Sequence, residues 1–320
     1  TASRVTTDGG QTVEAALALL LAKDHVYNGL DQAAAGYVLD ARAASALLAR
    51  MPSRSLLDNG SFAVNQRGAA SYAGAAGYSL DRWYRGSGMQ AEPKGYGVLL
   101  TGAATGDRSF DQRLEDYAAL AGKTVTLSAE VQALNGSATL AVLADGVSVG
   151  SAPITAAGIT ALTVTLPATI ATSLAVRVCP TAAGGTLALR RVKLELGAAG
   201  TLANDPPADR AAELLRCMRF YQQQRMVGVT LGAGYASGSA VAYVTLDTLA
   251  PMRIAPTVTC DAPTALYLAG GDKTAAVTSL GGAALYDGRL RLAVNTSGLT
   301  SGRLYALRGG DTVIAFSAEL

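Results

Sequence analysis

The chain contains a single histidine, His25, and this scarcity limits the chemistry open to it. A Ser-His-Asp catalytic site would need that residue, and the sequence has no G-x-S-x-G segment to position a nucleophilic serine. Cysteine is almost as rare, since Cys179, Cys217 and Cys260 are widely spaced and form no C-x-x-C pair. The sequence therefore excludes a metal site built from histidine and cysteine. We expect the three thiols to be reduced and buried, as in a protein assembled in a cytoplasm.

The chain also lacks a strong charge imbalance and a long apolar run. Its 26 basic and 24 acidic residues give a net charge of +2 and are interspersed. Because nucleic-acid binding needs clustered basic side chains, we expect no nucleic-acid partner. The apolar run at 15–22 is far shorter than the roughly 20 residues that cross a bilayer. Asp8 and Glu14 flank it and no basic region precedes it, so we expect neither membrane insertion nor a signal peptide.

Aromatic residues make up only 6% of the chain, although half of its residues are apolar. The excess of alanine, glycine, valine and leucine suits many short strands with tight turns. A length of 320 residues leaves room for about two domains. Over residues 54–197 the apolar positions alternate with period two, which predicts a β-sandwich of the jelly-roll type. The expected strands are 124–131, 138–143, 162–166, 174–178 and 187–196.

The last of these strands shows the clearest alternation. Val192, Leu194 and Leu196 are expected to face the core, and the charged residues between them to face solvent. Residues 198–222 are predicted to form a linker and a helix that buries a stripe of four apolar residues. That stripe consists of Leu214, Leu215, Met218 and Tyr221.

Beyond that helix, period-two alternation returns. Residues 223–320 are therefore predicted to form a second, C-terminal β-domain. Its Gly-rich segments, notably 232–238, are expected to be loops between strands.

Residues 1–53 are expected to be helical. Apolar residues at helical spacing predict one helix over 11–23 and another over 39–51 that ends at Pro52. Helices this short are marginal alone and must bury their apolar stripes. They would self-associate into a stalk or pack as a pair on the first sandwich, and His25 between them would be solvated or line the stalk.

Five short motifs occur in a fixed order along the chain. Asn59-Gly60-x-Phe62 comes first, followed by Gln66-Arg67-Gly68 and Asp81-Arg82-Trp83. V-K-L-E-L-G at 192–197 and C-M-R-F-Y at 217–221 complete the set. In this order and spacing they resemble the distal region of phage tail-fibre and receptor-binding proteins.

The resemblance covers residues 55–320 and implies a mainly β fold. A jelly-roll-like sandwich over 54–197 would be followed by a linker helix and a C-terminal β-knob. Residues 36–42 resemble a segment of tail-fibre shafts in which three copies wrap around one axis. Together these features imply a homotrimer with a short N-terminal helical stalk over residues 1–53.

The resemblance also implies a function, which is adhesion to the host cell surface. The ligand would be a glycan such as lipopolysaccharide or capsule, or a protein receptor. Residues 1–53 would attach to other tail or baseplate proteins, and the protein would be part of a virion assembled in the host cytoplasm. A purely structural tail or baseplate component is the alternative, and a polysaccharide-degrading tail spike is a second one. No cofactor is implied.

Sugar binding calls for exposed aromatic rings, because pyranose rings stack their apolar faces on them. The lone tryptophan, Trp83, is expected to pack in the sandwich instead, with Asp81 and Arg82 as a structural pair beside it. Asn59-Gly60 is read first as a turn and not as part of a calcium loop. The candidate ligand-binding residues are five tyrosines, for each of which a subunit-contact or strand-edge role is an equal alternative. They are Tyr84 and Tyr96 in the sandwich and Tyr235, Tyr267 and Tyr286 in the C-terminal domain.

Glycoside hydrolysis would need only a pair of carboxylates, and several cluster in one region. Tail spikes that degrade polysaccharides are built on long parallel β-helices with repeated rungs, and this sequence has no such repeat. A charged loop is the better interpretation, so we expect no enzymatic activity. The carboxylates concerned are Glu92, Asp107, Asp111, Glu115 and Asp116.

Overall fold

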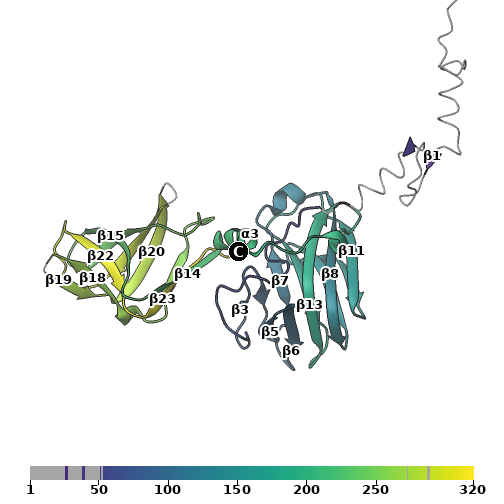
Figure 1. Ribbon diagram of the computed structural model, residues 1–320, viewed down its shortest axis with the longest axis horizontal. Helices are drawn as coiled ribbons and strands as arrows, with labels where there is room; N and C mark the ends of the chain where they lie inside the picture. Colours follow the sequence, from purple (N-terminus) through teal and green to yellow (C-terminus); the bar gives the residue numbers. More distant parts are fainter. Residues whose placement is uncertain (1–25, 28–37, 40–50, 52, 272, 287–288) are drawn as a thin grey trace, which may run out of the picture. The chain divides into compact units, whose positions relative to one another are not determined.

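The computed structural model describes residues 26–27, 38–39, 51, 53–271, 273–286 and 289–320. The chain divides into two compact units, residues 1–54 with 201–206 and residues 55–200 with 207–320. In the first unit, β1 (Val26–Tyr27) pairs in parallel with β2 (Val38–Leu39). The second unit holds two β-domains and the helix between them in sequence (Figure 1).

The helix predicted from Leu39 onward is wrong at its first residue, because Leu39 lies opposite Tyr27 in the β1–β2 pair. Valine and tyrosine favour extended backbone, and pairing with a second segment overrides a helical pattern read from one stretch alone. The helix predicted over 11–23 and the rest of the second one, at 40–50, lie outside the described residues. The stalk that they would form lies there too. None of the described helices is long and apolar enough to cross a membrane.

Two antiparallel sheets form the first domain and face each other in Figure 1. The six-stranded sheet has the order β10 (Val147–Ile154), β9 (Ala138–Ala144), β12 (Leu174–Pro180), β7 (Phe110–Arg113), β4 (Tyr84–Arg85) and β3 (Gly77–Tyr78). The five-stranded sheet has the order β11 (Gly158–Thr165), β8 (Thr124–Asn135), β13 (Thr186–Leu196), β6 (Gly97–Gly102) and β5 (Met89–Lys94). This arrangement confirms the predicted mainly β, sandwich-like fold.

Alternating residues of both sheets fill one hydrophobic core. In β12 every second residue is fully buried, namely Leu174, Val176 and Val178. They pack with residues of the opposite sheet such as Leu127 and Leu194 in a single cluster. Burial of about 25 cal/mol per Å² of apolar surface makes such a cluster the main stabilising contribution of the domain.

The outer face of β13 differs from the prediction. Lys193 and Glu195, expected in solvent, are almost fully buried and form an ion pair at 3.3 Å, while Leu196 is 53% exposed. The chain that follows the strand turns back over this sheet, because a Cβ atom on Gly200 would lie 2.7 Å from the hydroxyl oxygen of Ser128, the partner of Lys193 on β8. Alternation within one strand cannot reveal a cover that the next segment supplies.

The helix between the domains is α3 (Arg210–Met218), which is shorter than predicted. Asp209 caps its first turn by accepting hydrogen bonds from the backbone N–H groups of Ala211 and Ala212 at 2.9 and 3.2 Å. This is the N-cap arrangement that stabilises a helix start by about 1 kcal/mol.

The predicted apolar stripe of this helix is wrong at two of its four positions. Leu215 is 59% exposed, and Tyr221 belongs to β14 (Tyr221–Met226) instead of the helix. Residues 221–226 pair along their whole length with β23 (Thr312–Ser317) at the end of the chain. That long-range pairing takes the segment out of the helix.

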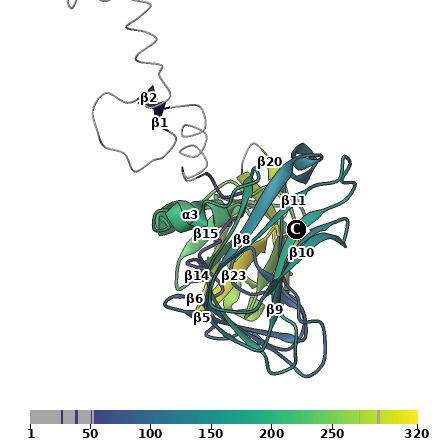
Figure 2. The same cartoon turned by 90° about the vertical axis from the view of Figure 1, so that its right-hand side faces the viewer.

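The C-terminal domain also contains two sheets. A three-stranded sheet has the order β14, β23 and β17 (Thr257–Cys260), and β14 and β23 lie side by side in Figure 2. The seven-stranded sheet has the order β19 (Lys273–Ala276), β18 (Leu266–Gly270), β22 (Leu304–Gly309), β15 (Thr230–Ala236), β16 (Val241–Leu246), β21 (Arg289–Asn295) and β20 (Ser279–Tyr286). Residues of both sheets, including Ile314, Phe316, Leu292 and Leu307, form a second hydrophobic core.

The Gly-rich segment 232–238, predicted to be a loop, is mostly strand β15. Its glycines allow close approach to β16, because a Cβ atom on Gly234 would lie 1.6 Å from the carbonyl oxygen of Tyr243. A Cβ atom on Gly232 would lie 2.2 Å from the carbonyl oxygen of Thr245. Glycine in a strand interior often marks such a close approach of another backbone.

Candidate functional site

The Asn59-Gly60 motif forms a buried turn that is fixed by its own side chain. The Asn59 amide donates hydrogen bonds to the carbonyls of Val64 at 2.8 Å and Asp81 at 3.0 Å, and its Oδ1 accepts one from the N–H of Val64 at 2.9 Å. Position 60 must be glycine, because a Cβ atom there would lie 2.3 Å from the carbonyl oxygen of Val192. The turn is therefore built into the sandwich and is not open to a ligand.

Trp83 is a core residue. Its ring is fully buried and stacks on Phe110 with a centroid distance of 4.9 Å and an interplanar angle of 7°. Phe62 packs against the same ring at 5.1 Å, and the indole N–H donates to the carbonyl of Asn59 at 3.0 Å. A buried tryptophan whose polar atom is satisfied in this way is part of the packing and not a sugar platform.

Asp81 and Gln66 connect the sandwich to β14. Asp81 accepts hydrogen bonds from the backbone N–H and the side-chain amide of Gln66, both at 2.7 Å, and the same amide donates to the carbonyl of Tyr221 at 2.7 Å. Burial removes water from the carboxylate and raises the pKa of Asp81 above its ordinary value, against the lowering effect of these hydrogen bonds.

Arg67 extends this connection. Its guanidinium lies 3.8 Å from the ring centroid of Tyr221 and forms an ion pair with Glu319 at 3.3 Å. A guanidinium over an aromatic face is attracted to the ring and leaves its N–H groups free for a carboxylate.

Arg82 occupies the centre of the same region. The predicted pair with its neighbour Asp81 is wrong, because Arg82 has other partners. Its guanidinium lies 3.5 Å from the ring centroid of Phe220 and donates to Asp58 at 3.2 Å and Glu319 at 3.0 Å. A further hydrogen bond reaches the carbonyl of Arg113 at 2.8 Å. The side chain is only 2% exposed, so its positive charge is compensated entirely by protein groups.

Helix α3 is held by the same motifs. Glu213 accepts a hydrogen bond from the backbone N–H of Asn59 at 2.5 Å, and Arg216 pairs with Asp58 at 2.8 Å. Four of the five sequence motifs thus contribute residues to one structural cluster, which we call the junction. It comprises Asp58, Asn59, Gln66, Arg67, Asp81, Arg82, Glu213, Arg216, Phe220, Tyr221 and Glu319.

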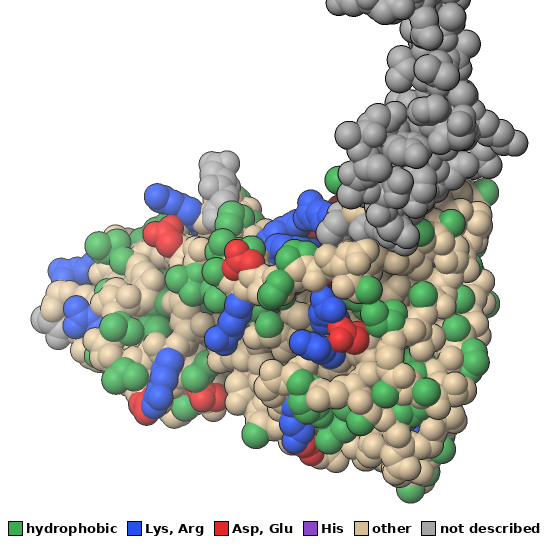
Figure 3. Space-filling view, turned by 45° about the vertical axis from the view of Figure 1, so that its right-hand side comes forward, with side chains coloured by type: hydrophobic (Ala, Val, Ile, Leu, Met, Phe, Trp, Pro, Cys, Tyr) green, Lys and Arg blue, Asp and Glu red, His purple; other side chains and the backbone are tan. Residues whose placement is uncertain are grey.

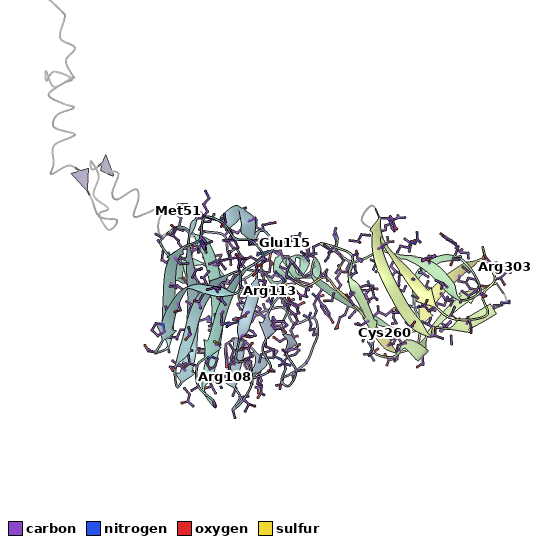
Figure 4. The ribbon with its side chains drawn as sticks, turned by 180° about the vertical axis from the view of Figure 1, so that it is seen from behind. Met51, Arg108, Arg113, Glu115, Cys260 and Arg303 are labelled. Carbon is purple, nitrogen blue, oxygen red and sulfur yellow. The ribbon has the colours of Figure 1, made fainter. Side chains whose placement is uncertain are left out.

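Four of the five carboxylates considered for hydrolysis are engaged by basic or hydroxyl side chains. Figure 4 places Glu115 and Arg113 on the side of the sandwich next to α3, where Glu115 pairs with Arg219 and Arg253, both at 3.1 Å. Asp111 forms a two-bond ion pair with Arg177 at 2.7 and 2.8 Å. Glu92 pairs with Lys94, Asp107 accepts a hydrogen bond from the hydroxyl of Ser109, and Asp116 stands at the start of a short 3-10 helix.

Tyr84 and Tyr96, the two tyrosines predicted in the sandwich, lie on different sheets. Tyr84 is 36% exposed on β4, beside Tyr78 at 5.3 Å, and opposite Asp111 of β7. Tyr96 lies in the turn between β5 and β6 and lines a pocket of about 450 Å³ with Gly95, Glu130, Gln132 and Arg190. Glu130 of this pocket is already paired with Arg190 at 3.4 Å and Arg191 at 2.7 Å.

Two of the three predicted C-terminal tyrosines belong to one continuous surface on the seven-stranded sheet. Tyr235 of β15 is 51% exposed and lies 6.2 Å from the ring of Tyr243, its partner on β16. The guanidinium of Arg291 lies 4.1 Å from the ring of Tyr243 and 5.6 Å from that of Tyr286, which is 57% exposed. We call Tyr235, Tyr243, Arg291 and Tyr286 the Tyr–Arg stripe.

A pocket of about 450 Å³ lies at one end of this stripe. Thr245, Tyr286, Arg289 and Arg291 line it. Thr245 and Arg291 are direct partners across β16 and β21, and Tyr286 pairs with Arg289 across β20 and β21. The sheet register thus brings a hydroxyl group, an aromatic ring and two guanidinium groups to one hollow.

Tyr267 does not belong to the stripe. It is half-buried on β18 and lies opposite Arg308 of β22. β18 is separated from β16 by two strands of the sheet. The five predicted tyrosines therefore fall into four places, and only Tyr235 and Tyr286 contribute to a common surface.

Tyr243, Thr245, Arg289 and Arg291 were missed in the sequence. Strand β21 did show an alternating pattern, because buried Leu290, Leu292 and Val294 alternate with outward residues. The sequence could not show that β21 lies beside β16. That neighbourhood depends on the order of strands in the sheet.

The thiols are free, but only Cys217 is fully buried. Burial raises its pKa, and burial likewise raises the pKa of the half-buried Cys179 to about 11. Cys260 is also half-buried, so the prediction of three buried thiols holds for one of them. No cluster of histidine, cysteine, aspartate or glutamate suited to a metal ion occurs in the described part of the chain. On the face shown in Figure 3, basic and acidic side chains are interspersed.

No protein-family model matches this chain, and no curated protein matches it in sequence. Among solved structures, a CBM4 carbohydrate-binding module is similar at 16% identity with a TM-score of 0.30, over 44% of this chain and 99% of that one. The CBM22-1–CBM22-2 tandem of Paenibacillus barcinonensis Xyn10C is similar at 12% identity with a TM-score of 0.28, over 79% of this chain and 100% of that one. A cycloisomaltooligosaccharide glucanotransferase of Paenibacillus sp. follows at 11% identity, with a TM-score of 0.19, over 78% of this chain and 45% of that one. These TM-scores are too low for the likenesses to say anything about the fold or the function of this chain.

Proposed function

We propose that this chain is a phage tail-fibre or receptor-binding protein, or its prophage or tail-like-particle equivalent, which binds a host-surface glycan without turning it over. The Tyr–Arg stripe is the observation that carries the proposal. It offers two tyrosine rings that are more than half exposed, on a sheet whose inner face is fixed by a hydrophobic core.

The chemistry of the stripe suits a sugar. A pyranose presents an apolar C–H face that packs on a tyrosine ring, while its hydroxyl groups need hydrogen-bond partners. Thr245, Arg289 and Arg291 supply such partners at the edge of Tyr286. Binding sites of this kind combine an aromatic surface with a few placed polar groups.

The junction supports a mechanical role for the chain. Buried ion pairs and guanidinium–aromatic contacts connect the sandwich to both ends of the C-terminal domain, through Tyr221 in β14 and Glu319 after β23. A C-terminal domain held at both its first and last strands is suited to carry load from a bound cell to a fibre. Residues 1–53 would attach to other tail or baseplate proteins.

Adhesion would be multivalent. In a homotrimer, three weak sites would bind one cell surface, and linked sites raise the overall affinity by about 10²- to 10⁴-fold without a single tight site. The trimer follows from the resemblance to tail fibres and is part of this proposal. The protein would be located in the virion after assembly in the host cytoplasm.

The test is binding of the purified, fluorescently labelled protein to a panel of bacterial strains before and after periodate oxidation of their surface glycans. We expect binding to some strains and its loss after oxidation. Binding to no strain would favour the purely structural tail or baseplate alternative. Binding that survives oxidation would favour a protein receptor.

Two further measurements examine the rest of the proposal. Light scattering coupled to size-exclusion chromatography should give three times the 32.4 kDa chain mass, and a monomer at micromolar concentration would contradict the trimer. Release of reducing ends from purified surface polysaccharide would favour the degrading tail spike.

A further inference from the structure

Arg291 differs from the other basic residues of the seven-stranded sheet in its surroundings. Its guanidinium lies between two aromatic rings, 4.1 Å from Tyr243 and 5.6 Å from Tyr286. Ring contacts hold the planar group in place while leaving its N–H edge available, which lowers the entropy lost when it binds a ligand.

Two of the four residues that line the pocket are charged, and both are arginines. Among the residues that the structure describes, no carboxylate forms an ion pair with Arg291. Arg289 pairs with Asp247 at 3.6 Å, but both side chains are at least 70% exposed. Such an exposed pair contributes little free energy, so another anion can readily replace Asp247 as the partner of Arg289. Asp287 lies between Tyr286 and Arg289 in the sequence but outside the described residues.

We infer that the pocket at the end of the Tyr–Arg stripe binds an acidic glycan. Arg291 pairs with a carboxylate or phosphate group of the sugar, Tyr286 packs on its ring, and Arg289 adds a second positive charge. This inference rests on the proposed function and names the ligand class for the same surface.

An anionic ligand explains the composition of this pocket better than a neutral one. A guanidinium presents a rigid fork of N–H donors that matches a carboxylate or phosphate with two parallel hydrogen bonds. Neutral sugars are bound equally well by amide and carboxylate side chains. The pocket at Tyr96 differs in this respect, because its one arginine, Arg190, is already paired with Glu130 of the same pocket.

The experiment uses the full chain on a printed array of bacterial surface glycans that bear uronic acids, bear phosphate groups, or are neutral. Two variants are compared with the wild type. Arg291→Gln removes the charge at the pocket. Arg308→Gln is the matched control, because Arg308 is an exposed arginine on β22 of the same sheet, outside the stripe.

We expect the wild type to bind acidic glycans and Arg291→Gln to weaken that binding by about tenfold or more, since a hydrogen-bonded charge contributes about 1.5–3 kcal/mol. Arg308→Gln should bind like the wild type, and Arg291→Lys should be intermediate. The uronate and phosphate spots show which acidic group is bound.

Binding to neutral glycans alone would overturn the inference and leave the proposed function intact. The same holds if Arg291→Gln binds acidic glycans as tightly as Arg308→Gln does. Binding to no glycan on the array, together with binding to no strain in the cell panel, would overturn the proposed function and the inference with it.

Discussion

Arg82 and Glu319 form a buried ion pair across 237 positions of the sequence, with a distance of 3.0 Å between Nη1 and Oε2. One residue belongs to the Asp81-Arg82-Trp83 motif of the sandwich, and the other is the penultimate residue of the chain. Their side chains are 2% and 3% exposed. The pair therefore couples the folding of the sandwich to the pairing of the last strand.

Replacing Arg82 by alanine should destabilise the protein strongly. Among the described residues, the change leaves the buried Glu319 carboxylate with Arg67 as its remaining ion-pair partner, and it removes the contact with Phe220. Loss of one member of a buried pair costs about 3 to 5 kcal/mol. We expect the free energy of unfolding in urea to fall by that amount.

Arg225→Ala is the matched control for this change. Arg225 also pairs with an aspartate, Asp311, at 2.9 Å, but their side chains are 69% and 65% exposed. Water screens this pair, so its loss should leave the urea midpoint unchanged. Equal effects of the two substitutions would contradict a structural role for the junction.

Gly234→Ala should disrupt the sheet that carries the Tyr–Arg stripe. The new Cβ atom would lie 1.6 Å from the carbonyl oxygen of Tyr243, and backbone on both strands must move to relieve the overlap. We expect a loss of at least about 2 kcal/mol in the unfolding of the C-terminal domain. Gly282→Ala on β20 has open space around its Cβ position and should cause no loss. Similar melting curves for the two variants would mean that β15 and β16 do not pair in this register.

Asp145 should make stability depend on pH. Its carboxylate accepts hydrogen bonds from the backbone N–H groups of Ala171, Thr172 and Ser173, and these bonds lower its pKa below the ordinary 3.8. Because the folded-state pKa is the lower one, the stabilisation is complete above pH 3.8 and is lost as the pH falls below it.

Asp145→Asn isolates this effect. Asparagine tolerates the left-handed backbone of this position, which has φ of 51°. The difference in unfolding free energy between wild type and variant should be largest near about pH 7 and shrink by about pH 3. A difference that stays constant between those two pH values would show that the carboxylate charge plays no part.

Part of the fold could be predicted from the sequence because it depends on local patterns. The strands at 124–131 and 174–178 alternate cleanly, and each is present as part of a longer strand. Apolar and polar residues alternate only weakly over 77–113, so strands β3 to β7 could not be predicted from the sequence. Tyr84 and Arg85 form a strand only because β7 and β3 lie beside them, and no pattern in two residues can show that.

The candidate site was less predictable than the fold. Exposed tyrosines near glycine-rich segments pointed to Tyr235 and Tyr286, but not to Tyr243 and Arg291, which connect them. Their proximity arises from the strand order β15, β16, β21 and β20. Strand order depends on the packing of the whole domain, so it cannot be predicted from one segment of the sequence at a time.

The most direct test of the account compares cell binding of Tyr286→Ala and Tyr96→Ala, the same substitution in the two tyrosine-lined pockets. The measurement is a titration of the labelled protein on a strain that the wild type binds. The account predicts that Tyr286→Ala weakens binding by about tenfold, as expected when a stacking aromatic side chain worth about 1 to 1.5 kcal/mol is lost, while Tyr96→Ala binds like the wild type. Unchanged binding by Tyr286→Ala, with binding lost in Tyr96→Ala, would contradict it and move the glycan site to the sandwich.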